Sequence, residues 1–438
     1  MIAATSSWTG SYRLPRSAPP VAIVVRATGS HAAVSLGPGH AYTQRVSVTI
    51  RGTRIRFALS GSPTNVVFVG RVSSKRLRGT VTQGKRKGSF SLRRGRDRIV
   101  ELLGAYHAAG REVAVTEASG LPPFLTEFPS GAAHGIGRSL SVGRRLGDRS
   151  GYGRIAMDAT GFTWRGTHYT RLHVRQREIR VGVDAATLSL PPGKGPFPAV
   201  AMVHGSGPTT RDEFDVFTAW LVLHGVAVLA DDKRGTGQSV GVYPGDQATP
   251  ATLELLAGDA QKEVDFLDRL PQVDANRVGL WGDSQGGWIS VLAASRDSAI
   301  NWLVENSGPT VSVGEADYWA SLAGQSLYPP SGTFAQMLKQ VEAQGRSGFD
   351  PAPYLRKLST PGLWMFGSDD RNIPTQLCVQ RLQQLRAGQD FSWNVLPTAH
   401  TPLILPTGLL SSLPHSPGFD PHFFPDIAKW LQGQAITH

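Results

Sequence analysis

Residues 278–296, VGLWGDSQGGWISVLAASR, place Ser284 between an apolar, β-prone run and a stretch with helical spacing. Gly282 and Gly286 lie two residues before and two residues after this serine. In a sharp turn from strand to helix, a side chain at either position would collide with its neighbours. Such a turn would hold the hydroxyl of Ser284 at a helix N-terminus, which makes it a candidate nucleophile.

A serine hydroxyl attacks a carbonyl carbon only when a base removes its proton and a third group orients that base. Two apolar runs that follow Ser284 end in residues of the required types. Residues 361–367 precede the adjacent acids Asp369 and Asp370, and residues 391–396 precede His400. Serine, acid and histidine thus follow one another along the chain in an order compatible with a catalytic triad.

Apolar runs alternate with amphipathic stretches, such as 251–270, throughout residues 171–438. Buried strands joined by helices predict an α/β catalytic domain, with a mostly parallel sheet and helices on both faces. The runs end in Gly, Asp, His or Ser, at the strand ends where open α/β sheets bind ligands. The segment 310–358 is long for a connection and is expected to form a cap over the site. The runs are 198–208, 225–235, 277–287, 300–309, 361–370 and 391–400.

Two β-rich segments precede this domain. Residues 1–95 show period-2 alternation in short runs, which predicts a basic antiparallel sheet or small barrel. Residues 96–170 predict further strands and hairpins. Residues 1–98 hold 18 Lys and Arg and one acid, Asp97, although the whole chain carries only +12. This charge favours an anionic partner such as nucleic acid, acidic polysaccharide or a membrane surface, or else belongs to a well-solvated β-domain. No specific nucleic-acid motif accompanies it.

Five motifs in order resemble the α/β-hydrolase superfamily: HGSGP (204–208), DDKRGTGQS (231–239), GDSQGG (282–287), GSDDRNIP (367–374) and Ala399–His400. More narrowly, the chain resembles bacterial serine hydrolases of the carboxylesterase and prolyl-oligopeptidase-like group with a β-rich N-terminal extension. The resemblance implies an α/β-hydrolase fold and a Ser–His–Asp triad. In that family the acid stands three residues after the strand-ending glycine, which favours Asp370 over Asp369. His400 is favoured as base over His415 and His422.

The oxyanion of acyl transfer requires backbone N–H donors near the nucleophile. Gln285, directly after Ser284, is expected to supply one donor. The HGSGP loop is expected to supply the second, from Ser206 or from Gly205 next to it. His204 is interpreted as a residue that positions this loop rather than as a second base.

The remaining residues of these motifs are expected to be structural. Asp283 would make a turn contact, and Trp288 would pack in the core. Arg234 and Ser239 would anchor their loop beside the site. The G-x-G of that loop is a poor dinucleotide signature, because Val240 stands where a third glycine is required.

The residues favour a carboxylesterase for short or medium acyl or aryl esters, acting through an acyl-enzyme. The alternative is an aminopeptidase or amidase of the prolyl-oligopeptidase type, which would need an acid to bind the substrate's amino terminus. Glu315 and Asp317 could serve, unless they belong to a solvated helix face. A hypothesis of another class makes residues 1–95 a binding module for an anionic envelope polymer.

Several classes are not expected. The sequence has no H-E-x-x-H motif, no paired cysteines and no carboxylate cluster at ligand spacing, so we expect neither a metal nor a cofactor. Its single cysteine, Cys378, excludes an internal disulfide. It has no apolar stretch of membrane-spanning length and no signal-peptide pattern, so the chain is expected to be either a mature extracytoplasmic protein or cytoplasmic. The apolar segment 401–425 would either line a pocket or pack as core.

Overall fold

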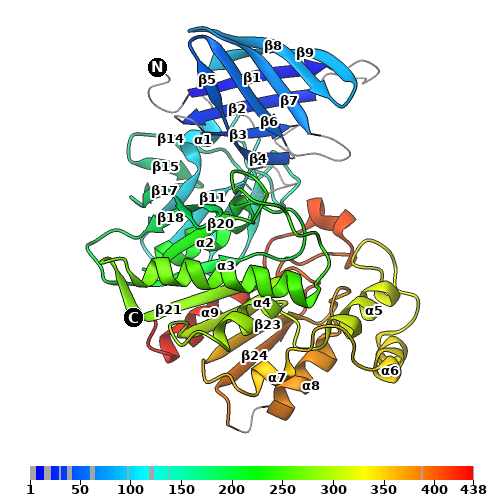
Figure 1. Cartoon of the computed structure of the whole chain (residues 1–438). Helices are drawn as coiled ribbons and strands as arrows, with labels where there is room; N and C mark the ends of the chain where they lie inside the picture. The colour runs from blue at the N-terminus through cyan, green and yellow to red at the C-terminus, as the bar shows by residue number, and fades with distance from the viewer. Residues whose placement is uncertain are drawn as a thin grey trace.

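The computed structural model describes residues 6–13, 21–28, 31–36, 42–59, 65–95, 98–117, 123–137, 139–385 and 388–437. Its strands form three sheets, which follow one another from the N-terminal end of the molecule to the C-terminal end (Figure 1). No helix among these described residues is long and apolar enough to cross a membrane. The division of the chain into separate domains at residues 95 and 170 stays a prediction.

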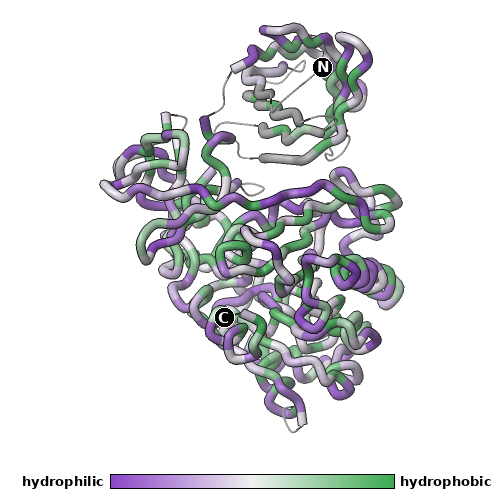
Figure 2. The backbone as a smooth tube through the Cα atoms, turned by 90° about the vertical axis from the view of Figure 1, so that its left-hand side faces the viewer, coloured by the Kyte–Doolittle hydropathy of each residue, from purple (hydrophilic) through white to green (hydrophobic). Residues whose placement is uncertain are grey.

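The first sheet has nine strands and is antiparallel throughout, as its alternating pattern predicted. In β6, Ile55 and Phe57 are buried while Arg54 and Arg56 are exposed. The strands curl into a ring around an apolar core of their own (Figure 2). The strands are β1 (Ser6–Arg13), β2 (Val21–Thr28), β3 (His31–Leu36), β4 (Tyr42–Ser47), β5 (Thr49–Arg51), β6 (Arg54–Leu59), β7 (Val66–Val72), β8 (Arg76–Gln83) and β9 (Arg86–Gly95).

The second sheet has seven antiparallel strands and is preceded by a short helix, α1 (Arg98–Leu102). We predicted a strand there, but Ile99 and Leu102 lie three residues apart and are both buried, which suits one face of a helix. The strands are β10 (Gly104–Ala108), β11 (Arg111–Thr116), β12 (Phe124–Phe128), β13 (Ala133–Gly135), β14 (Ala156–Met157), β15 (Gly161–Trp164) and β16 (Thr167–Arg171).

The third sheet has eight strands in the order β17-β18-β20-β19-β21-β22-β23-β24 and is mixed. The six strands from β20 through β19 to β24, in the order of the sheet, pair in parallel. The pairs β17–β18 and β18–β20 are antiparallel. Only two residues join β17 to β18, and a parallel connection needs about a dozen. The strands are β17 (Arg175–Val181), β18 (Asp184–Leu190), β19 (Phe197–Val203), β20 (Ala227–Asp232), β21 (Val273–Asp283), β22 (Trp302–Asn306), β23 (Gly362–Gly367) and β24 (Phe391–Leu396).

Helices cover both faces of this third sheet. Helices α3, α4 and α8 contribute to the core on one face, and α2 and α9 to the core on the other. The second core also takes in Phe124 and Phe128 of the middle sheet, with Phe128 and Phe424 at 4.8 Å between ring centroids. The helices are η1 (Arg211–Phe214), α2 (Asp215–Leu223), α3 (Pro250–Asp268), α4 (Gln285–Ala294), α5 (Val313–Ala323), α6 (Phe334–Gln344), α7 (Ala352–Leu355), α8 (Thr375–Leu385), η2 (Leu410–His415) and α9 (Phe423–Gly433).

The segment 310–358 supplies α5, α6 and α7. Together with α8, it lines an open pocket of about 440 Å³, to which Trp319, Phe334 and Val379 contribute. Asp370 lines this pocket as well, so the insertion packs beside the carboxyl end of β23. The segment 401–425 was expected either to line a pocket or to pack as core. Its Phe419 is buried in the core shared with the middle sheet, so that residue packs as core.

Candidate active site

Ser284 stands alone between β21, which ends at Asp283, and α4, which begins at Gln285. Its φ of 53° and ψ of −116° lie outside the regions that L-residues normally occupy. Strain of this kind persists only where the surroundings enforce it, and it is concentrated at functional sites. A Cβ on Gly282 would lie 2.1 Å from Oε2 of Glu305, and one on Gly286 would lie 2.4 Å from the carbonyl oxygen of Val203. The glycines therefore allow the close packing that forms the turn.

The structure brings Ser284, His400 and Asp370 together. The hydroxyl of Ser284 lies 2.8 Å from Nε2 of His400, and Nδ1 of His400 lies 2.8 Å from Oδ2 of Asp370. The backbone N–H groups of Asn372 and Ile373 donate to Oδ1 of Asp370 at 2.8 and 3.0 Å. A buried carboxylate held from two sides in this way fixes the orientation of the imidazole.

The rival candidates lie elsewhere. Asp369 forms an ion pair with Arg371 at 3.2 Å. His422 lies 3.2 Å from Asp420 and its side chain is 72% exposed, while His415 ends η2. The contact with His400 therefore belongs to Asp370.

Charge around His400 favours its protonated form. Burial by itself disfavours the imidazolium, but the carboxylates of Asp370 and, less strongly, Asp283 outweigh this and raise the pKa of His400. A histidine tuned in this way can accept a proton from Ser284 and hold it while negative charge develops nearby.

The HGSGP loop follows β19 and reaches the serine. A Cβ on Gly205 would lie 3.3 Å from Cβ of Ser284, so this backbone runs directly past the hydroxyl-bearing side chain. Ser206 is exposed, and Gln285 is buried at the start of α4. The use of their N–H groups as oxyanion donors stays a prediction.

His204 fixes the base of the same loop. Its Nε2–H donates to the carbonyl oxygen of Asp231 at 2.8 Å, and its Nδ1 lies 2.9 Å from the hydroxyl of Thr209. The ring also packs on Phe214. These contacts suit a positioning residue.

Lys233 is a residue of this site that the sequence analysis missed. Its ammonium donates to the carbonyl oxygen of Gly205, to that of Gly207 at 3.2 Å, and to Oε1 of Gln285 at 3.5 Å. It thus connects the loop to the residue after Ser284. Burial lowers the pKa of Lys233 to about 8. A charged residue directly after a buried strand, in DDKRGTGQS, is the signal that could have revealed it.

The other residues of the motifs make local contacts. Arg234 forms an ion pair with Asp259 at 2.6 Å, and the hydroxyl of Ser239 accepts from the N–H of Ala185 at 2.8 Å. Asp283 accepts from the side-chain amide of Asn306, and the indole N–H of Trp288 donates to the carbonyl oxygen of Val311 at 2.9 Å.

Glu315 differs from both of its predicted roles. It is buried, it caps α5 together with Ser312, and it forms an ion pair with Arg381 at 3.0 Å. It is therefore neither on a solvated face nor free to bind an amino terminus. Asp317, two residues on, is exposed.

Residues 194–347 match the family model described as serine aminopeptidase, S33. The chain is 27% identical over 223 residues to esterase EstD of Thermotoga maritima, covering 45% of this chain and 52% of that protein. It is 28% identical over 237 residues to the peroxisomal succinyl-coenzyme A thioesterase of Mus musculus, covering 49% and 51%. The chain thus spans about half the length of these relatives.

A solved esterase of Pyrococcus furiosus, Pf2001, aligns with 60% of this chain and 92% of its own at 18% identity and a TM-score of 0.42. The family match covers Ser284 and the motifs HGSGP, DDKRGTGQS and GDSQGG. With the curated relatives and the strand–serine–helix turn, this match supports an α/β-hydrolase serine hydrolase.

Proposed function

We propose that this protein is a serine hydrolase that cleaves carboxylic esters of short or medium acyl or aryl groups. The observation that carries the proposal is the unbroken hydrogen-bonded series from Ser284 through His400 to Asp370. The relatives include an esterase and a thioesterase, which supports ester cleavage as the reaction class.

In the proposed reaction, Oγ of Ser284 attacks the ester carbonyl carbon while Nε2 of His400 accepts the hydroxyl proton. Asp370 keeps the proton of Nδ1 in place and stabilises the imidazolium. The N–H groups of Gln285 and of the HGSGP loop stabilise the oxyanion. The tetrahedral intermediate then collapses, and the alcohol leaves with the proton from His400. Water attacks the acyl-enzyme by the same route and restores the serine.

The alternative is cleavage of peptide bonds, which the name of the matching family favours. An aminopeptidase needs an acid that binds the substrate's ammonium group. Glu315 is already engaged by Ser312 and Arg381, which leaves Asp317 as the candidate from that helix. The engagement of Glu315 removes one of the two candidate acids, which supports esters over peptides as the substrate class.

The test measures hydrolysis of p-nitrophenyl esters of increasing chain length beside acyl-coenzyme A thioesters and aminoacyl p-nitroanilides. We expect ester turnover that falls at least about 10⁴-fold in Ser284→Ala. Ser295→Ala, at the far end of α4, is the matched control and should retain activity. Turnover of anilides alone would establish the peptidase instead. Ester turnover that survives in Ser284→Ala would refute the proposed nucleophile.

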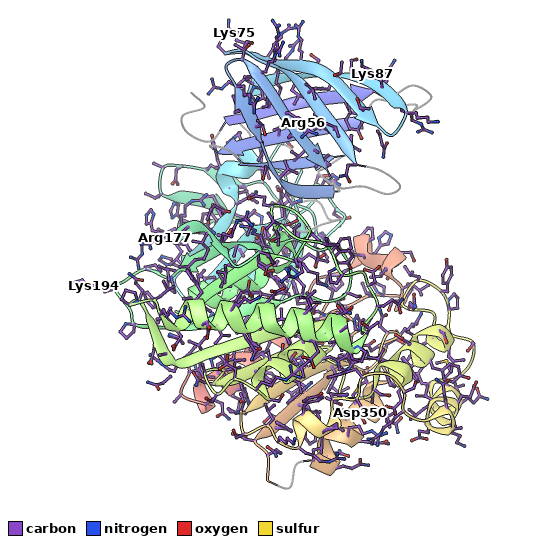
Figure 3. All side chains as sticks on the ribbon, in the orientation of Figure 1. Arg56, Lys75, Lys87, Arg177, Lys194 and Asp350 are labelled. Atoms are coloured by element: carbon purple, nitrogen blue, oxygen red, sulfur yellow. The ribbon has the colours of Figure 1, made fainter. Side chains whose placement is uncertain are left out.

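A second candidate function concerns the N-terminal sheet, whose exposed face is basic. Arg56, Lys75 and Lys87 project from it into solvent (Figure 3). Arg71 on β7 lies directly opposite Arg54 on one side and Arg78 on the other. Like charges at opposed positions destabilise a sheet, and an anionic polymer laid across the row would remove that cost. We propose such a polymer as the partner of this face.

Retention on a heparin column, with heparin as the polyanion probe, tests this second function on the full-length protein. Replacing Arg71 and Arg78 by serine should shift elution to lower salt. Replacing Arg177 and Lys194 by serine removes the same charge from a different part of the molecule and serves as control (Figure 3). Equal elution of the two double variants would count against a site on the N-terminal sheet.

A further inference from the structure

Three buried carboxyl groups meet behind the HGSGP loop. Asp184 begins β18, Asp231 lies near the end of β20, and Glu263 lies on α3. One oxygen of each lies within 4.8 Å of the others. The three residues are only 2%, 7% and 3% exposed. They line a cavity of about 30 Å³, which exceeds the roughly 10–15 Å³ that a single water-sized particle occupies.

The nearby cationic side chains are engaged by other acceptors. Arg234 binds Asp259 through two of its nitrogens, Arg211 binds Asp232, and Lys233 donates to the carbonyls of the HGSGP loop. His204 lies at Asp231, 3.2 Å from Oδ1. Among the residues that the structure describes, Asp184 and Glu263 form no ion pair, and Arg234 and Lys262, whose charges act on Asp184, both bind Asp259.

Two oxygens of the cluster are without a hydrogen-bond partner in the part of the chain that the structure describes: Oδ1 of Asp184 and Oε1 of Glu263. Both side chains are more than nine-tenths buried and line the cavity. A buried carboxylate oxygen without a partner is strongly unfavourable, so a cation in the cavity would stabilise both groups in their ionised form.

We propose that Asp184, Asp231 and Glu263 bind a calcium ion. The donors are all carboxylate oxygens, which hard cations prefer over the nitrogen and sulfur ligands of transition metals. Mg²⁺ usually keeps several of its waters and takes only one or two carboxylates, whereas Ca²⁺ accepts about six to eight oxygen ligands in a flexible geometry, so a buried set of three carboxylates suits calcium.

The ion would also steady the candidate active site. Asp231 contacts His204 through its carbonyl oxygen, and His204 is the first residue of the HGSGP loop. A cation on the Asp231 carboxylate would therefore hold the end of β20 in place, and with it the carbonyl to which His204 donates. Binding itself does not depend on the proposed esterase activity.

The competing arrangement is a cluster that keeps protons in place of a cation. Burial, together with the carboxylates of Asp231 and Asp259, raises the pKa of Asp184 to about 8 when no metal is present. A protonated cluster would gain nothing from calcium, and Glu263→Gln would leave it equally or more stable.

The test follows the thermal unfolding of the full-length protein after treatment with EDTA and dialysis, with Ca²⁺, Mg²⁺ or Na⁺ added alone. We expect Ca²⁺ to raise Tm by about 3–6 °C at a hundredfold excess over Kd, with a further logarithmic rise at higher concentrations and one equivalent bound by calorimetry. Glu263→Gln should weaken binding at least about 10-fold. Asp265→Asn, on the exposed part of the same helix, is the matched control and should respond like the parent.

A parent protein whose Tm does not respond to Ca²⁺ overturns the proposal, whether or not the variant folds. An undiminished response in Glu263→Gln, or a response to Mg²⁺ and not to Ca²⁺, also overturns it. Because Tm and bound calcium are the readouts, a failure of the ester assay leaves this result unaffected.

Discussion

Replacing Lys233 by methionine tests whether its ammonium holds the HGSGP loop, the predicted source of an oxyanion donor. The buried Nζ donates to the carbonyls of Gly205 and Gly207. A methionine side chain has nearly the length and volume of lysine but no hydrogen-bond donor, so the loop loses the hydrogen bonds that hold its carbonyls. Loss of one oxyanion donor costs about 10²–10³ in kcat. A displaced loop retains some of that stabilisation, and we expect kcat to fall by about 10–100-fold with a smaller change in KM.

The pH profile separates this role from simple packing. Activity should rise as His400, whose pKa the Asp370 carboxylate raises against the effect of burial, loses its proton. It should fall again as pH passes about 8, because Lys233 then becomes neutral and holds the carbonyls less firmly. Lys233→Arg keeps its charge throughout this range and should lack the alkaline decline.

The assay is kcat/KM for a p-nitrophenyl ester between pH 5.5 and 10, corrected for spontaneous hydrolysis. Lys262→Met, on the exposed side of α3, is the matched control and should follow the parent profile. A Lys233→Met variant that keeps both the parental kcat and the decline near pH 8 would show that the ammonium does not hold the loop.

Three further outcomes are expected. Asp370→Asn should lower kcat by about 10³–10⁴-fold without changing Tm by more than a few degrees, and an activity loss equal to that of Asp369→Asn would contradict the choice of acid. Burial, together with Asp283 and Asp212, raises the pKa of Glu213 to about 7 despite the opposing charge of His204. The protonated Glu213 side chain therefore contributes fully to the free energy of unfolding below pH 4.5. This contribution, about 3 kcal/mol, is lost as pH rises through 7, so Glu213→Gln should flatten that part of the Tm–pH curve. Equal slopes in both proteins would contradict this. Gly286→Ala should cost about 1–3 kcal/mol of unfolding free energy and most of the activity, whereas Gly258→Ala, with open space around its Cβ, should be neutral or stabilising by denaturant titration.

Alternation and apolar runs predicted the fold well, because they report which face of an element is buried. The pattern around Ile55 and Phe57 predicted the antiparallel N-terminal sheet, and the runs ending in Gly, Asp or His predicted the α/β arrangement. The mixed character of the third sheet was missed, since the hairpin at residues 182–183 depends on loop length rather than on hydrophobicity. Helix α1 was missed because five residues show too little periodicity.

The candidate site was predictable where a residue type and its spacing carry the chemistry. Ser284 and His400 meet this condition, and a family pattern was needed to prefer Asp370 over its neighbour Asp369. The structure distinguishes the two acids through contacts with His400 and Arg371 that come from different parts of the fold. The carboxyl cluster could not be predicted from local spacing, because Asp184, Asp231 and Glu263 lie far apart in sequence.

The core that α2 and α9 share with the middle sheet bears on how this molecule can be divided. Phe424 of α9 packs on Phe128, and Trp220 of α2 lies in the same core. A truncation at residue 171 would leave these aromatic faces open to water and would invite aggregation. The nine-stranded sheet has a core built from described residues between 8 and 92, so its removal would not expose this shared aromatic core. The smallest fragment that stays folded around the candidate site should therefore begin near residue 98, because the middle sheet shares a core with α2 and α9.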